Sequence, residues 1–416
     1  MLADATDAEA WDPCPTVAYA RDIMDPRLDL AAMVGRIAYH VVKEKLTNPR
    51  PTSLREVPPS PGHLTNEWLT LALCDGTPGA EVMGYEVSGR DEGTSSRARL
   101  RVRYNDAGRD AGLPTALFTK SGATFKTRLV SAAAGLSKIE SQFYALVRPT
   151  LAIEAPPTRY SAYDPVTNRQ LLLMDDVTAT VGATFGDVLT RNLTRDQAEK
   201  VVDTLAALHA KFWGAPLQRM YGSWLWNSYE FQATLNVYIG AVARIASGFE
   251  RGRDVIPARL HPRRGELADA MMRSLKINIR GPQTMLHSDP HPGNWYVTKA
   301  GAMGLCDWQC VAQGGWARDI AYALATNLPP ENRRAWERDL IARHGERLAE
   351  AGIRPPSADE AFLAYRQAMT HPTMMWLCVL GRHASQPVFQ LHEVTVELVR
   401  RVCTAADDLD TLDAIP

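Results

Sequence analysis

The sequence LHSDPHPGNW occupies residues 286–295, and LCDWQ follows it after a short hairpin at residues 305–309. Together these segments contain the three groups that phosphoryl transfer requires. One carboxylate must take the proton of an attacking hydroxyl, and two oxygen ligands must hold Mg²⁺ against the phosphates of a nucleotide. Asp289 is the candidate base, and Asn294 and Asp307 are the candidate metal ligands. The two segments therefore predict a phosphoryl-transfer centre.

The spacing H-x-D-x-x-x-x-N in the first segment resembles the catalytic loop of the protein-kinase-like fold. Asp307 stands where the second metal-binding aspartate of that fold follows a short apolar strand, and it opens a D-W-Q motif. The run ARDIAY at residues 317–322 matches as well. From about Leu64 to its C-terminal region, the chain is similar to the aminoglycoside phosphotransferase and choline kinase-like superfamily. Within that superfamily it most resembles the ecdysteroid kinase-like branch.

This resemblance implies an α+β fold with two lobes: an N-lobe with an antiparallel sheet and a helix, and a mainly helical C-lobe. It also implies an enzyme that uses ATP and Mg²⁺ to phosphorylate a hydroxyl group of a small molecule. We expect an N-terminal helical extension and a proline-rich connector at residues 1–60. The N-lobe is expected at residues 61–178 and the C-lobe at residues 179–416.

The extension is predicted from helical periodicity between Leu28 and Leu46. Its apolar residues recur at the spacing of one helix face. These residues are Leu30, Val34, Ile37, Ala38 and Val41. Several prolines between Pro49 and Pro61 then favour an extended connector, because proline fixes φ and lacks a backbone donor. This change of pattern places the domain boundary near residue 60.

Residues 97–104 alternate between arginine and apolar side chains, which predicts a half-exposed antiparallel strand. Residues 82–87 are its expected partner, and residues 88–96 form the connection. Backbone N–H groups in this glycine-containing connection could cradle the phosphates of ATP. It could equally be an ordinary hairpin, because it is not a G-x-G-x-x-G loop. The candidate phosphate contacts are Gly93, Thr94 and Ser95.

A short apolar strand ends at Lys120. In the family that the chain resembles, the lysine of this strand contacts the α- and β-phosphates and pairs with a glutamate on the next helix. Glu140 is the candidate partner, and Lys126 is an alternative lysine that has no apolar strand before it. A lone lysine and glutamate this far apart are usually solvated. The pair is therefore expected from the resemblance alone.

The run from Leu171 to Val177 resembles the strand and hinge that join the two lobes, where backbone groups receive the adenine edge. It also fits a plain buried strand that ends in acidic residues. The candidate nucleotide contacts here are Leu173, Met174, Asp175 and Asp176.

Other residues near the centre are expected to support the catalytic loop. Asp319 resembles a brace that opens a helix and holds the loop, and His287 is expected to brace it too. Ser288 stands where related sequences usually have glycine, which suits serine only if the backbone there does not need a positive φ. Cys306 and Cys310 are expected to act as small buried hydrophobic residues.

Composition excludes several other classes of protein. The 416 residues are 45% hydrophobic with a net charge of −1, so nothing favours nucleic acid or an anionic membrane as a partner. There is no run of eighteen apolar residues and no basic leader before an apolar run. The six cysteines lack C-x-x-C spacing. We expect a cytoplasmic protein of undetermined oligomeric state whose partners are a nucleoside triphosphate and a small-molecule alcohol.

The acceptor is the least determined part of the prediction. Residues 215–285 are rich in aromatic side chains and contain ten basic and five acidic residues. Such a field would repel a polycationic antibiotic and favour an apolar or coenzyme A-linked alcohol. An aminoglycoside-type phosphotransferase and a catalytically silent nucleotide-binding protein remain alternatives. A protein kinase is disfavoured because no A-P-E-like segment fits between Asp307 and Asp319.

Overall fold

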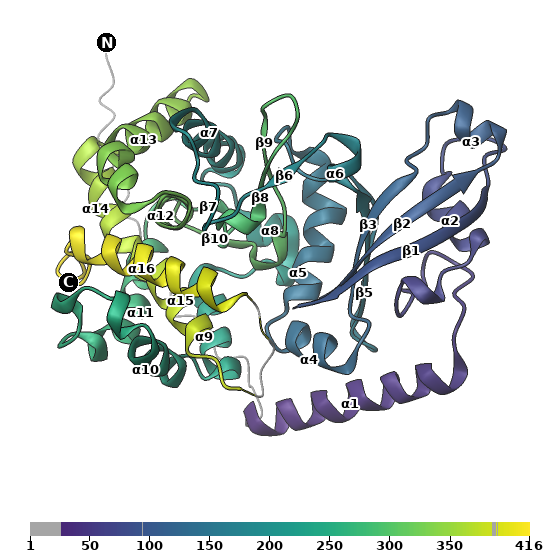
Figure 1. Ribbon diagram of the computed structural model, residues 1–416, viewed down its shortest axis with the longest axis horizontal. Helices are drawn as coiled ribbons and strands as arrows, with labels where there is room; N and C mark the ends of the chain where they lie inside the picture. Colours follow the sequence, from purple (N-terminus) through teal and green to yellow (C-terminus); the bar gives the residue numbers. More distant parts are fainter. Residues whose placement is uncertain (1–25, 94, 385–387, 389) are drawn as a thin grey trace, which may run out of the picture.

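The computed structural model describes residues 26–416, apart from residues 94, 385–387 and 389. The chain forms two lobes, one around a five-stranded sheet and the other mainly of helices (Figure 1). This confirms the α+β bilobal fold expected from the sequence. In the described part of the chain, no helix has the length and apolar character needed to cross a membrane.

The N-lobe sheet is antiparallel, with the strand order β1-β2-β3-β5-β4. The expected arginine-rich strand is present, but its partner β1 runs further than predicted, to Glu92. A register shift between Ser88 and Asp91 accommodates the extra residues, so only residues 93–95 connect the strands. The strands are β1 (Val82–Glu92), β2 (Ser96–Tyr104), β3 (Ala116–Ser121), β4 (Thr158–Asp164) and β5 (Arg169–Asp175).

The two faces of this sheet have different neighbours. Alternate apolar residues such as Leu100, Val102 and Leu173 pack with Trp68 and Leu69 of α2 (Asn66–Leu73). The other face lies toward α5 (Leu136–Gln142), which follows α4 (Phe125–Ala133) and continues into a π-helical turn. Figure 1 shows α5 between the sheet and the helical lobe. This second face is the one that can contribute to a site between the lobes.

The C-lobe packs its helices around an apolar core that extends to α5 and β5 of the N-lobe, and it carries two small sheets, β6-β8-β9 and β10-β7. Its strands are β6 (Thr184–Phe185), β7 (Thr284–Leu286), β8 (Trp295–Val297), β9 (Met303–Leu305) and β10 (Ala312–Gly314). Its longer helices are α7 (Arg195–Phe212), α9 (Ser228–Ile239), α10 (Ala241–Arg251), α11 (Leu267–Asn278), α12 (Ala317–Asn327), α13 (Pro330–Glu350), α14 (Ala358–Ala368), α15 (Thr370–Leu380) and α16 (His392–Asp408). The shorter helices of the chain are α3 (Asp106–Asp110), α6 (Val177–Thr180) and α8 (Leu217–Tyr221). The proposed boundaries at residues 60 and 178 stay predictions.

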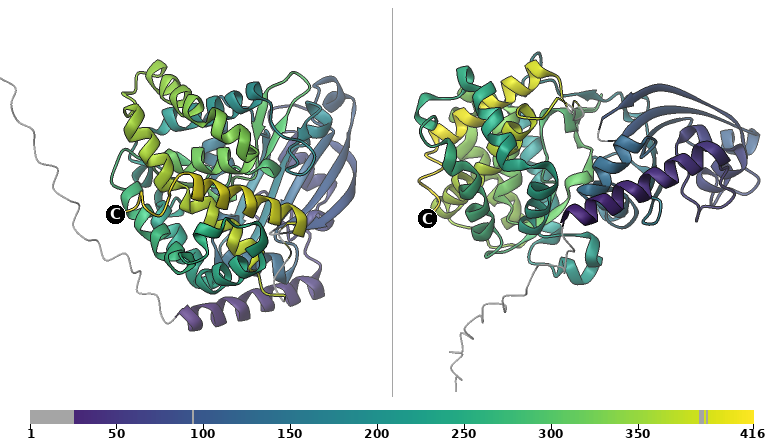
Figure 2. Two further views of the ribbon diagram at one scale, coloured as in Figure 1. Left: turned by 60° about the vertical axis from the view of Figure 1, so that its left-hand side comes forward. Right: turned by 90° about the horizontal axis from the view of Figure 1, so that it is seen from below.

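The predicted extension is the helix α1 (Pro26–Thr47), which lies alongside α4 at the edge of the N-lobe (Figures 1 and 2). Ile37 and Val41 are buried as expected, but Leu30 is exposed. Glu44 accepts hydrogen bonds at 2.9 Å from both terminal nitrogens of Arg128 and from Nε of Arg169. Burial alone would raise the pKa of Glu44, but these two arginines lower it below its ordinary value. A buried ion cluster therefore attaches the extension to the N-lobe.

Replacing Glu44 with alanine should destabilise the protein, because it leaves the fully buried Arg128 without its counter-ion. Removing one partner of a buried ion pair costs roughly 3–5 kcal/mol of unfolding free energy. Denaturant unfolding measures this loss. Lys45→Ala, an exposed position in the same helix turn, is the matched control and should change stability by less than about 0.5 kcal/mol. Equal stability of the two variants would contradict the docking of α1 through Glu44.

Candidate active site

The three groups of the predicted centre lie around the β8–β9 hairpin of the C-lobe. The side-chain amide of Asn294 donates to the backbone carbonyl of Asp289 at 2.8 Å. The backbone N–H of Cys306 donates to the carbonyl of Asn294 at 2.9 Å. These bonds hold both ends of the hairpin against the loop that follows β7. The structure thus brings Asp289, Asn294 and Asp307 together.

Lys120 on β3 reaches the same place from the N-lobe. Its Nζ atom donates to Oε1 of Glu140 at 2.6 Å and to Oδ1 of Asp307 at 2.9 Å. The other carboxylate oxygen of Glu140 accepts from Gln170 at 3.3 Å. Burial alone would lower the pKa of Lys120, but the carboxylates of Asp307 and Glu140 raise it above its ordinary value, so the side chain stays cationic. The alternative lysine, Lys126, is exposed on α4.

Asp289 is partly shielded from solvent, with 21% of its side chain exposed. Burial raises its pKa, while His291, Tyr322 and His287 act in the opposite direction without cancelling the rise. Nε2 of His291 lies 3.9 Å from the carboxylate. A carboxylate with a raised pKa is a stronger base than an ordinary aspartate, as a group that accepts a hydroxyl proton should be.

Buried side chains hold the backbone of the catalytic loop in place, as expected from the sequence. Fully buried Asp319, in the first turn of α12, accepts from the backbone N–H of His287 at 2.7 Å and of Ser288 at 2.8 Å. The N–H of Asp289 donates to Nδ1 of His287 at 3.2 Å, so Nε2 is the protonated nitrogen that donates to the carbonyl of Cys306 at 3.0 Å. The loop is therefore positioned by side chains that do not themselves face a substrate.

Ser288 corrects one expectation, because its backbone does adopt a positive φ of 67°. A left-handed conformation costs a residue with a Cβ atom roughly 1–2 kcal/mol. The peptide groups on both sides of Ser288 are held: Asp319 accepts from its N–H, and His371 donates to its carbonyl at 3.0 Å. Asp307 has a similar φ of 64°. Strained backbone therefore occurs at both segments of the centre, as it often does at active sites.

The hinge candidates divide into buried apolar residues and paired acids. Leu173 and Met174 are buried in β5. Both oxygens of Asp175 accept from Arg159 at 2.8 Å, and Asp176 accepts from Arg99 at 3.0 Å. Both carboxylates are therefore paired with arginines, so the backbone of this segment is the part that could contact the adenine ring of a nucleotide.

The backbone of this segment is held on both sides. The N–H of Asp175 donates to the carbonyl of Pro157 at 2.9 Å, and the N–H of Asp176 donates to the carbonyl of Ala116 at 3.1 Å.

The β1–β2 turn contains the predicted phosphate contacts. The N–H of Gly93 donates to the carbonyl of Ser95 at 3.0 Å, which closes the turn, and the side chain of Ser95 is buried. Thr94 lies outside the described residues. The turn is shorter than the phosphate-binding connection that was expected from the sequence.

The donor set suits Mg²⁺ only if a nucleotide supplies further ligands. The amide nitrogen of Asn294 is used by the carbonyl of Asp289, so its amide oxygen remains as the acceptor. Asp307 gives one oxygen to Lys120 and keeps the other. No cluster of three or more His, Cys, Asp or Glu side chains that could hold a metal occurs within the described ranges. Mg²⁺ is commonly bound by one or two protein oxygens together with substrate phosphates, which these residues fit.

The acceptor argument drawn from residues 215–285 is weakened by the structure. Trp224, Phe231 and Phe249 are buried in the C-lobe core. Arg259 pairs with Asp407 and Asp410, and Arg263 pairs with Glu266 and Asp413. Carboxylates near the C-terminus, which lie outside the sequence window, thus neutralise part of its positive charge. The local excess of basic residues does not establish an anionic acceptor.

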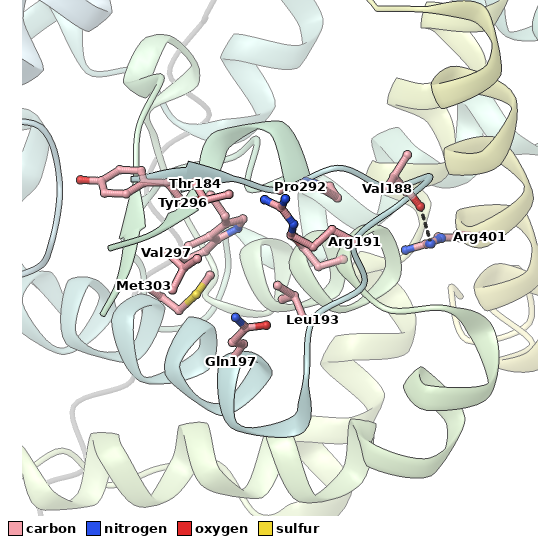
Figure 3. Close-up of a pocket in the computed structure, with 13 residues that line it drawn as sticks. Thr184, Val188, Arg191, Leu193, Gln197, Pro292, Tyr296, Val297, Met303 and Arg401 are labelled. Carbon is pink, nitrogen blue, oxygen red and sulfur yellow. Dashed lines mark hydrogen bonds between the residues drawn. The ribbon is translucent and has the colours of Figure 1, made fainter. Parts of the chain in front are cut away.

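A small cavity is lined by residues of β6, β8 and α7 (Figure 3). Pro292, Leu193, Gln197 and Met303 are among its lining residues, and Arg401 donates to the carbonyl of Val188 at its edge, at 3.0 Å. Its volume of about 20 Å³ is enough for one water molecule. This cavity is therefore too small to enclose an acceptor alcohol of several carbon atoms.

Tyr322 is a residue near the base that sequence reasoning missed. It interacts with Asp289 and lies in α12, one turn after Asp319. The only sequence signal was its place in the ARDIAY run, where its helical spacing from Asp319 puts both on one side of α12. Gln170 was also missed, because its contact with Glu140 depends on how α5 packs against β5.

Residues 128–356 match the model of the phosphotransferase enzyme family. No curated protein matches the chain. The family match confirms the broad resemblance seen in the sequence, whereas the ecdysteroid kinase-like branch stays a prediction.

Solved structures with a similar arrangement share little sequence with this chain. Macrolide 2'-phosphotransferase from Brachybacterium faecium is 15% identical, with a TM-score of 0.42 over 73% of this chain and 88% of that chain. Choline kinase from Streptococcus pneumoniae is 10% identical, with a TM-score of 0.45 over 79% of this chain and 94% of that chain. Ethanolamine kinase from Plasmodium vivax is 11% identical, with a TM-score of 0.42 over 79% of this chain and 83% of that chain.

Proposed function

Because the chain belongs to the phosphotransferase enzyme family, we propose that it transfers the γ-phosphate of ATP to a hydroxyl group of a small molecule. The observation that carries this proposal is the convergence of both lobes on one point. Lys120 from the N-lobe sheet forms an ion pair with Asp307 of the C-lobe, next to the loop that contains Asp289. A cation, a metal-binding carboxylate and a base are the parts that phosphoryl transfer needs.

In the proposed reaction, Asp289 orients the acceptor hydroxyl and accepts its proton at a carboxylate oxygen. The acceptor oxygen forms a bond to the γ-phosphorus, and the bond from that phosphorus to the β–γ bridging oxygen breaks. ADP leaves with the electron pair of the broken bond. Lys120, which Glu140 orients, donates to phosphate oxygens once a nucleotide is bound. Mg²⁺, when held by Asn294 and Asp307, would neutralise phosphate charge.

The base of the nucleotide would lie along the hinge. Met174 offers a buried apolar surface on the face of the sheet that carries Lys120, whereas Leu173 packs with α2 on the other face. An ATP-dependent reaction also fits the cytoplasmic location expected from the sequence.

The acceptor is proposed to be an apolar alcohol or one linked to coenzyme A. Pairing of the arginines with C-terminal carboxylates removes part of the charge that favoured a coenzyme A carrier. We therefore place the apolar alcohol first.

Calorimetric titration tests the metal and nucleotide assignment. We expect affinity for ATP to fall when Mg²⁺ is removed and to fall in Asp307→Ala even when Mg²⁺ is present. The reason is that the variant loses the carboxylate that joins the metal to the phosphates. Asp196→Ala, at an exposed position on α7, is the control and should bind like the wild type. Equal affinity under all of these conditions would remove the metal assignment.

A further inference from the structure

The arginine-rich strand β2 turns its charged face toward the active site. Leu100 and Val102 occupy the opposite face of the strand and pack in the cluster that contains α2. Because side chains alternate along a strand, the arginines of β2 lie on the face away from α2. They are Arg97, Arg99, Arg101 and Arg103.

The pairing register shows which arginine is nearest to the catalytic lysine. Arg97 lies directly opposite Lys120, whereas Arg101 lies opposite Ala116. Residues directly opposite each other in an antiparallel pair project on the same face with their Cβ atoms about 5 Å apart. Lys120 on this face reaches Glu140 and Asp307. Arg97 therefore projects beside the lysine that is proposed to contact phosphates.

The guanidinium of Arg97 also lies over the β1–β2 turn. A Cβ atom at Gly93 would be 2.9 Å from its terminal nitrogen, so glycine allows this approach. The same nitrogen pairs with Asp91 at 2.7 Å, and the Asp91 side chain is 65% exposed. Nε of Arg97 is buried and has no hydrogen-bond partner among the residues that the structure describes. By contrast, Arg99 is paired with the nearly buried Asp176.

We propose that Arg97 binds the phosphates of the nucleotide from the N-lobe side of the site, opposite Asp307 and beside Lys120. This inference rests on the proposed function and adds a residue to it. The planar guanidinium offers parallel donors that match phosphate oxygens. Arg97 supplies from a side chain the contacts that repeated glycine N–H groups provide in longer phosphate-binding loops. Asp91 holds the guanidinium over the turn in the absence of a nucleotide.

Titration of Arg97→Ala with three ligands tests this role without a known acceptor. We expect its affinity for ATP with Mg²⁺ to fall about tenfold or more, because a charge-assisted hydrogen bond is lost. Affinity for ADP should fall as well, while affinity for adenosine should stay unchanged. Arg97→Lys should recover only part of the loss, since an ammonium keeps the charge without the planar fork. Arg101→Ala, on the same face and farther from Lys120, is the matched control.

The outcomes separate this proposal from the function on which it rests. A wild-type protein that binds no ATP would overturn the proposed function, and the role of Arg97 with it. Wild-type affinity for ATP in Arg97→Ala would overturn the role of Arg97 alone. Equal losses for adenosine and ATP, or an equal loss in Arg101→Ala, would also overturn it, since the phosphates would not be the group recognised.

Discussion

Replacing Asp289 with asparagine is expected to abolish most turnover while leaving nucleotide binding nearly unchanged. The amide keeps the shape of the side chain but cannot accept the proton of the acceptor hydroxyl. General bases contribute on the order of 10²–10⁴ to the rate, and the loss should fall in this range. Steady-state kinetics with an established acceptor measures it, and calorimetry with ATP and Mg²⁺ checks binding. Near-wild-type turnover would refute the assignment of Asp289 as the base.

The pH profile of the wild type gives a second view of the same group. Burial raises the pKa of Asp289 above its ordinary value. Below that raised pKa the carboxyl is protonated and cannot act as a base, so turnover should fall as the pH decreases through it. We expect the acid limb at a pH above the ordinary aspartate value of about 3.9. Asp289→Asn should lack this limb in its residual activity.

Replacing Lys120 with arginine is the second change with a large expected effect. Lys120 is buried between Glu140 and Asp307, and its ammonium donates to both at 2.6 and 2.9 Å. Arginine keeps the charge, but its wide planar fork cannot take the place of a compact ammonium there. Turnover should fall by roughly 10²-fold, as when one stabilising donor is removed from an active site.

Lys126→Arg is the matched control for this experiment, because Lys126 is exposed on the neighbouring helix α4. It should retain wild-type turnover. Full activity in Lys120→Arg, or an equal loss in Lys126→Arg, would show that the wrong lysine has been assigned.

The sequence was most informative where the chemistry is local. Asp289, Asn294 and Asp307 could be recognised together because their residue types and spacing follow from proton transfer and metal ligation. Lys120 and Glu140 could not be recognised in this way. Their pairing depends on how β3 and α5 pack. Only the order of elements in the family that the chain resembles indicated this pairing.

Side chains whose burial or backbone conformation is unusual for their residue type were harder to predict. The helix that contains Glu44 was expected, but a buried glutamate was not, because most glutamates are solvated. Arg97 belongs to a strand that was correctly predicted, but the alternating pattern indicated only that the arginine face of this strand is exposed to solvent. Because α2 covers one face of β2, the other face is turned toward the active site. The sequence of β2 alone does not indicate which face that is. Ser288 likewise adopts a positive φ that its residue type disfavours.

The most direct test of the central claim is to follow the γ-phosphate itself. Wild-type protein with γ-labelled ATP, Mg²⁺ and a library of small alcohols should form a labelled phosphate ester with at least one alcohol. Asp289→Asn, used as the blank, should form none above background. Mass spectrometry of the product should place the phosphate on a hydroxyl oxygen. Release of label only to water, or equal ester formation by the wild type and Asp289→Asn, would contradict the account.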